Sequence, residues 1–208
     1  KPLFTRKKKN LMAENYDVAV GKAAPSGVLY MAPAGTPLPS TTTETLNSAF
    51  VPVGILDDDG VTIATDTDNT EVKDMDGNIV LTINSSYSET IQFVMLETNI
   101  NSLKARYGTD NVKQTGTTIQ VEHKTPSGEH LALVVDLLMA GNNRRLRKVI
   151  ADATLSESGD LQYHSGDAIT YNVTYKCNKS PVLDGATSRD FIAPITAAPV
   201  ITPPAHHD

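Results

Sequence analysis

The most regular feature of the chain is a two-residue alternation of polar and apolar positions, which is typical of β-strands with one solvated and one buried face. The even positions of the segment 81–93, LTINSSYSETIQF, are uncharged polar residues: Thr82, Asn84, Ser86, Ser88, Thr90 and Gln92. The segment 168–177, AITYNVTYKC, repeats the alternation with Thr170, Asn172 and Thr174 on its polar face. We expect Ile83, Ile91 and Phe93, together with Tyr171 and Val173, to pack into the core.

Three further segments, 117–124, 130–139 and 146–155, have strand-like patterns, which brings the prediction to at least five strands. Strands with one wet and one dry face are typical of antiparallel sheets. One helix is expected at 98–108, with Thr98 or Asn99 as its N-cap and Gly108 as its stop. The predicted fold is therefore all-β, a mostly antiparallel β-sandwich or split barrel with one short flanking α-helix and long extended N- and C-terminal arms.

Proline-rich segments border these strands. The segment 23–52 contains Pro25, Pro33, Pro37, Pro39 and Pro52 and is predicted to be an extended arm with little regular structure. Residues 194–208 are predicted to be a second arm, because their prolines exclude a helix or an interior strand. Met12 resembles a translation start, and residues 1–16 are a basic leader. A single β-domain is expected at 17–193.

The charge is distributed unevenly. The net charge is −6, but without the five cations of residues 1–11 the chain has 13 basic against 24 acidic residues, a balance of −11. An acidic body is poorly suited to binding the phosphates of nucleic acids. Eight of the acids lie in the segment 56–77, LDDDGVTIATDTDNTEVKDMDG, which is predicted to be a long acidic loop.

No catalytic, metal or cofactor site is predicted. The acidic segment does not fit the calcium-loop template, because Gly60 falls at position 4 when the loop starts at Asp57. The chain has no Trp and few aromatic residues, which disfavours a sugar hydrolase. Cys177 is the only cysteine, and the five histidines lack ligand spacing. The longest apolar run, 131–140, is too short for a membrane span and contains Asp136.

The acidic segment has a possible counterpart in the basic run NNRRLRK. The two could pair within one subunit, or the acids Asp57, Asp58 and Asp59 could meet Arg144, Arg145, Arg147 or Lys148 of another subunit. The second arrangement is a heterologous contact, which generates rings or open filaments. Terminal arms that bury little in their own domain fit the same picture, because they can lie across neighbouring copies.

Several motifs in the order found here resemble the major tail proteins, or tail tube proteins, of long non-contractile-tailed bacteriophages. They are the segment around APAGTPLP, the entry GILDDDGVT and the strand-to-helix run FVMLETNINSLKARYG, within residues 17–193. The resemblance implies a structural, non-enzymatic virion protein. Its six-membered rings would stack into a tube that conducts DNA into the host, after assembly in the host cytoplasm. Partners implied are further copies of the chain and the tape-measure, tail-terminator and distal-tail proteins.

Alternatives from other classes stay open. A distal-tail or tail-terminator protein would form single rings, and a β-sandwich adhesin or decoration module would be a stable monomer with short termini. In the tube hypothesis, the uncharged row from Thr82 to Gln92 and its neighbours Thr170, Asn172 and Thr174 face either the lumen or the outside of the tube, and their lack of charge favours the lumen. A wall of this kind wets easily but does not hold phosphate.

Overall fold

The alternating segments form antiparallel strands, and the all-β prediction with one short helix is confirmed. A computed structural model describes residues 19–23 and 27–195. In chain order its elements are β1 (Val20–Ala23), β2 (Leu29–Pro33), β3 (Val51–Pro52), β4 (Leu56–Lys73), β5 (Ile79–Met95), α1 (Ile100–Tyr107), η1 (Thr109–Asn111), β6 (Val112–Thr115), β7 (Thr118–Val121), β8 (His130–Ala140), β9 (Arg144–Ser158), β10 (Tyr171–Cys177), η2 (Pro181–Leu183) and β11 (Arg189–Pro194). The predicted basic leader and most of the C-terminal arm lie outside the described residues.

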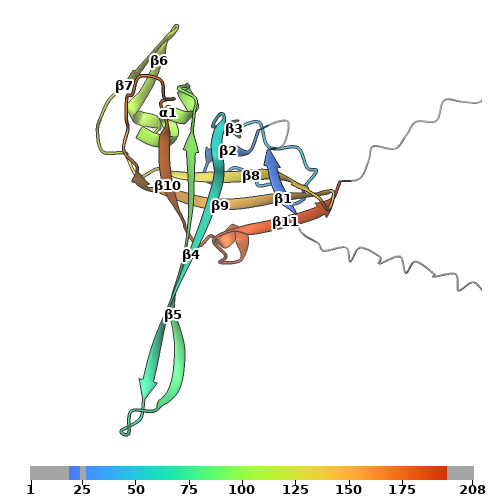
Figure 1. Cartoon of the computed structure of the whole chain (residues 1–208), viewed down its shortest axis with the longest axis vertical. Helices are drawn as coiled ribbons and strands as arrows, with labels where there is room; N and C mark the ends of the chain where they lie inside the picture. Colours follow the sequence, from blue (N-terminus) through green and yellow to red (C-terminus); the bar gives the residue numbers. More distant parts are fainter. Residues whose placement is uncertain (1–18, 24–26, 196–208) are drawn as a thin grey trace, which may run out of the picture.

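The strands form one large sheet in the order β3-β2-β8-β9-β10-β5-β4, with all neighbours antiparallel. Strand β1 pairs with the part of β8 beyond β2, and β11 pairs with the part of β9 beyond β10. Figure 1 shows β8, β9 and β11 running across the long axis of the molecule, whereas β10, β5 and β4 run along it. The sheet thus changes direction between β9 and β10, where the pairing contains an irregularity at Thr174 and Tyr175.

The main core lies between this sheet and α1. Ile91 and Phe93 of β5 and Tyr171 and Val173 of β10 are buried there, as predicted. Leu103 of α1 packs against the same cluster. Phe93 also stacks on Tyr175, with ring centroids 5.9 Å apart. These contacts hold the inner ends of β5 and β10 firmly in the body of the protein.

The opposite face of β2, β8 and β9 carries a second core. Tyr30 and Ala32 alternate with Leu29 and Met31, so the two pairs lie on different faces of β2 and are all buried. Phe50, at the end of the connection between β2 and β3, packs into this second cluster. The prediction of an extended arm at 23–52 was therefore wrong for β2, β3 and Phe50, which belong to the body.

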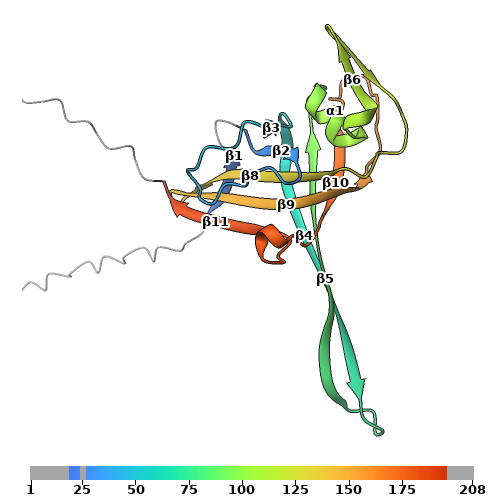
Figure 2. The same cartoon turned by 180° about the vertical axis from the view of Figure 1, so that it is seen from behind.

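Helix α1 is capped by Asn99, one of the two predicted N-caps, and ends at the predicted stop, Gly108. The Asn99 side chain accepts hydrogen bonds from the backbone N–H groups of Asn101 and Ser102, and the Ser102 hydroxyl accepts one from the Asn99 backbone. This reciprocal pattern is a capping box. Gly108 ends the helix with a φ of 86°, a conformation that favours glycine. Strands β6 and β7 form a separate two-stranded ribbon beside the helix (Figure 2).

The acidic segment differs most from its prediction. Residues Leu56–Lys73 form an 18-residue strand, and only 74–78 form a turn, so the prediction of a long loop was wrong. The β4–β5 hairpin extends well beyond the rest of the sheet (Figures 1 and 2). Ile83 lies on this extension and is exposed, contrary to the prediction that it packs in the core. Among the described residues no helix is long and apolar enough to span a membrane.

Candidate assembly surfaces

The hairpin extension ends in a turn that is held rigidly by its own polar groups. The Asp74 carboxylate accepts hydrogen bonds from the backbone N–H groups of Asp76, at 3.0 Å, and Asn78, at 2.8 Å, and from the Asn78 side chain. The bonds from Asn78 hold the pKa of Asp74 below its ordinary value. Gly77 completes the turn with a φ of 85°. The turn therefore presents Met75, which is fully exposed, in a defined position.

A β-bulge at Ser85 shifts the alternation of β5 by one residue. The polar residues of β5 on the two sides of the bulge therefore lie on opposite faces of the hairpin. Asp68 pairs with Ser86, but the next residue, Asn69, pairs with Asn84, so Ser85 is an extra residue on β5. Directly paired residues share a face, and successive residues of β4 alternate between faces. Thr82 and Asn84 therefore face away from the side on which Ser86 lies. The prediction that these polar residues form one continuous row was wrong.

The part of the row on the body side of the bulge does form a polar surface. Ser86, Ser88, Thr90 and Gln92 share a face, which continues onto β10 because Thr174 pairs with Gln92. The Gln92 side chain donates a hydrogen bond to the Asn172 side chain over 3.3 Å. Thr170 lies just before β10 and is partly buried.

The same polar face carries charge that the sequence pattern did not reveal. Asp66 and Asp68 of β4 pair with Ser88 and Ser86, and the Ser86 hydroxyl donates to the Asp68 carboxylate over 2.9 Å. Lys176 of β10 pairs with Thr90 and adds one cation at the other end. The surface is therefore acidic toward the hairpin extension rather than uncharged.

Beyond the bulge, the extension exposes large apolar side chains on a two-stranded ribbon. Val72 pairs with Leu81, and Thr70 pairs with Ile83, so Val72, Leu81 and Ile83 lie on one face. Six such residues are exposed in this part of the hairpin: Val72, Met75, Ile79, Val80, Leu81 and Ile83. Exposed apolar groups gathered in this way mark interaction sites in soluble proteins. The apolar segment IVLTI after an Asp-Gly turn was the sequence signal for this hairpin.

The three consecutive acids at the base of β4 lie in different environments. Asp58 and Asp59 are exposed, whereas Asp57 is partly buried. Burial raises the pKa of Asp57, and the charges of Asp59 and Asp58 add to this effect. No ion pair joins these acids to the basic run within residues 27–195.

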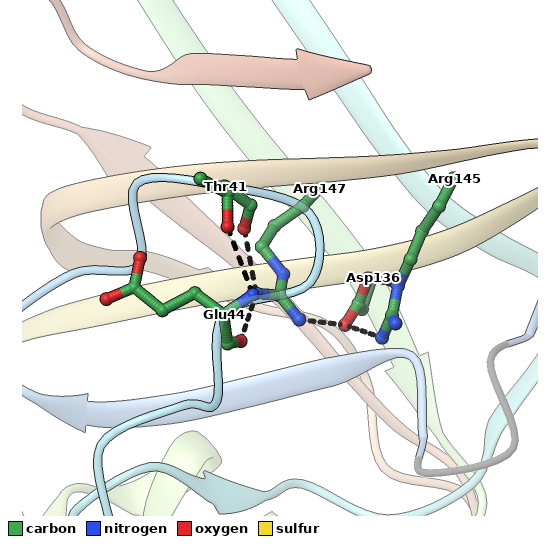
Figure 3. Close-up of polar contacts among 5 residues, drawn as sticks. All are labelled: Thr41, Glu44, Asp136, Arg145 and Arg147. Carbon is green, nitrogen blue, oxygen red and sulfur yellow. Dashed lines mark hydrogen bonds and ion pairs between the residues drawn. The ribbon is translucent and has the colours of Figure 1, made fainter. Parts of the chain in front are cut away.

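The basic run is instead engaged inside its own subunit (Figure 3). Asp136, which is 1% exposed, accepts hydrogen bonds from Arg145 and from Arg147 over 2.7 Å each. Arg147 is 3% exposed and also donates to the backbone carbonyls of Thr41, at 3.0 Å, and Glu44, at 2.6 Å. This buried cluster fastens the connection between β2 and β3 to the sheet. It also removes Arg147 from the surface that another copy could contact.

The other two cations of the run differ in their roles. Lys148 lies 2.9 Å from the carboxylate of Asp190 and 3.5 Å from that of the buried Glu89. Burial lowers the pKa of Lys148, but Asp190 and Glu89 outweigh it and raise the pKa above its ordinary value. Lys148 therefore ties β9 to β11 and β5. Arg144 is partly exposed at the start of β9, directly after the turn 141–143.

The described residues contain no cluster of three or more side chains that could hold a metal ion. Cys177 is buried, and burial raises the pKa of its thiol to about 12, so the thiol is inert at neutral pH. The notable features of the described surface are an acidic polar face and an apolar hairpin extension, and the extension suits contacts between proteins.

These features define a β-protein whose most conspicuous surface, the apolar hairpin extension, suits contact with other proteins. A family model described as "Phage tail tube protein" matches residues 12–198, and the chain belongs to this family. It is accordingly a structural component of a phage tail.

Solved structures with a similar chain course include a prophage tube cap and two parts of an extracellular contractile injection system. The tube-terminating cap of the anti-feeding prophage is 13% identical, with 89% of this chain and 100% of that chain covered and a TM-score of 0.38. The sheath–tube complex of the PVC extracellular contractile injection system is 12% identical, with 84% and 93% covered and a TM-score of 0.38. The sheath/tube terminator of that system is 12% identical, with 84% and 99% covered and a TM-score of 0.37. No curated protein matches the chain at a significant level.

Proposed function

We propose that six copies of this chain form a ring and that the rings stack into the hollow tube of a long, non-contractile phage tail. Membership of the tail tube family supports a role in the tail. The observation that carries the proposal is the hairpin extension, which exposes six large apolar side chains that the subunit itself does not cover. An isolated two-stranded ribbon is at best marginally stable in water, so neighbouring copies are its natural support.

In this proposal the acidic polar face of β4, β5 and β10 lines the lumen. Ser86, Ser88, Thr90 and Gln92, with Asn172 and Thr174, keep the wall wet. Asp66 and Asp68 repel the phosphates of passing double-stranded DNA. Such a wall would let the genome slide without holding it. Thr82 and Asn84, beyond the bulge, are not part of this wall.

Ring-to-ring charge pairs are a further element of the proposal. Asp58 and Asp59 are exposed, and Arg144 and Arg145 are the partly exposed cations of the basic run. A contact between these groups of different copies would contribute about 0–1 kcal/mol per pair and would be repeated around each ring. The tape-measure protein inside the tube, and terminator and distal-tail proteins at its ends, complete the proposed partners in the virion.

Electron microscopy of the purified protein tests this proposal. We expect negatively stained tubes with sixfold symmetry in end views, and light scattering that rises with protein concentration. Single rings that never stack would instead favour a distal-tail or tail-terminator protein. A monodisperse monomer at high concentration would overturn the tube.

A further inference from the structure

The tip of the hairpin has a fully exposed methionine between two carboxylates. Met75 is held by the Asp74 turn, and the Asp76 side chain has no partner among the described residues. A methionine can fit apolar cavities of irregular shape because its side chain is unbranched and flexible. The chemistry of the tip therefore suits an apolar cavity with a cation at its rim.

A cavity with these properties lies on the other side of the molecule. It has a volume of about 390 Å³ and an apolar lining from β2, the approach to β3 and the start of β8: Met31, Ala32, Pro33, Ala49, Val51 and Leu131. The lining also includes one cation, Lys104 of α1, and one carboxylate, Glu129. The Glu129 carboxylate accepts a hydrogen bond from the Thr109 backbone N–H over 2.7 Å, and no carboxylate pairs with Lys104 within the described part of the chain. We call it the α1 cavity.

A second, larger cavity is a poorer receptor. It has a volume of about 670 Å³, but its lining sets only one cation, Lys22, against the carboxylates of Asp57, Asp58, Asp59 and Glu97. These carboxylates would repel Asp74 and Asp76 at the hairpin tip. In the α1 cavity the carboxylate of Glu129 is balanced by Lys104, so charge favours the α1 cavity over the larger, acidic one.

The tip and the α1 cavity lie on opposite sides of the sheet body along its long axis. Figure 1 shows the hairpin pointing away from the body on the side opposite α1, whose residues Asn101 and Lys104 line the cavity. A contact between two different, oppositely placed surfaces is heterologous and can be repeated without end. The occupant that fits this geometry is a second copy of the chain.

We propose that Met75 of one copy inserts into the α1 cavity of a copy in the adjacent ring, with Asp76 facing Lys104. This docking rests on the proposed stacking of rings, and it names the surfaces that stack. Because a ring carries six tips, the contacts act together and a modest single contact suffices.

The test compares tube growth by wild type and by Met75→Ser, with Val182→Ser as the control. Val182 is also a well-exposed apolar residue, but it lies on η2, away from both surfaces. Met75→Ser should raise the protein concentration needed for tubes by about tenfold or more, since each contact loses a buried methionine. Val182→Ser should behave like wild type.

A charge exchange tests the pairing itself. Asp76→Lys and Lys104→Glu should each weaken tube growth, and the double variant should recover a substantial part of it. Wild-type tubes with unchanged growth in Met75→Ser, or no recovery in the double variant, would overturn the docking and leave the tube proposal standing. A wild type that forms neither rings nor tubes would overturn both.

Discussion

Asp136 is the residue on which the second core depends. A carboxylate that is 1% exposed is costly to bury, but two guanidinium groups compensate its charge. Arg147 in turn carries the connection between β2 and β3 through two backbone carbonyls. The Nε atom of Arg147 has no hydrogen-bond partner among the described residues, so this buried guanidinium already has one unsatisfied donor.

Replacing Asp136 should therefore destabilise the fold strongly. Asp136→Asn leaves a buried, uncompensated Arg147, and we expect the free energy of unfolding to fall by about 3–5 kcal/mol. Asp190→Asn is the matched control, because it also removes a carboxylate from an ion pair of the basic run but at a site with 42% exposure. The control should cost less than about 1 kcal/mol. Urea unfolding measures both, and equal midpoints would contradict this role for Asp136.

The sequence contained a signal for this cluster that pattern reasoning did not use. Asp136 interrupts an otherwise apolar strand, and an arginine-rich strand follows directly after a short turn. Antiparallel neighbours of this kind bring the two segments together, since Asp136 pairs with Arg147. What the sequence could not supply is the covering connection that makes the site buried, because that depends on tertiary packing.

At the scale of elements, local signals were sufficient for α1. Asn99 and Gly108 act through hydrogen bonds and backbone conformation within a few residues, so they were predicted correctly. The β4 strand was not predicted because its outer part is solvated on both faces. It therefore lacks the row of buried apolar residues by which a strand is recognised. The sequence pattern also does not indicate the bulge at Ser85, since Ser and Asn are equally compatible with a strand register with or without the extra residue. Strand β2 was hidden by the prolines around it, although its residues LYMA are apolar.

The capping box gives a prediction for α1. Asn99→Ala removes the acceptor for two backbone N–H groups, and we expect it to lower the free energy of unfolding by about 1 kcal/mol. Asn99→Ser retains a capping oxygen while losing the same contacts of the amide nitrogen to Glu97 and Val53. Thermal unfolding of the two variants isolates the cap. If both lose the same stability, the cap contributes nothing and the amide contacts account for the loss.

At the scale of the whole molecule, the chain combines a body that is stable by its own packing with an extension that has no core of its own. Two apolar clusters and two buried ionic groups, around Asp136 and Glu89, hold the body. On β5, residues 79–87, which form the side of the hairpin toward its tip, have no buried side chain. This division suits a subunit that folds first and assembles afterwards, because only the extension lacks packing contacts until another copy binds it.

The bulge at Ser85 also allows a sharp test of which face meets DNA. Ser86 and Gln92 lie on the proposed lumen face, whereas Thr82 lies on the opposite face of the same strand. Lysine at Ser86 and Gln92 would bind phosphates and release counterions, so phage tails built from this variant should assemble but eject DNA more slowly. The delay should grow at low salt, where charges are less screened. Thr82→Lys adds a lysine to the same exposed strand and should leave ejection unchanged. Ejection kinetics measured on intact particles decide between the faces: a delay from Thr82→Lys alone would move the lumen to the other side of the sheet.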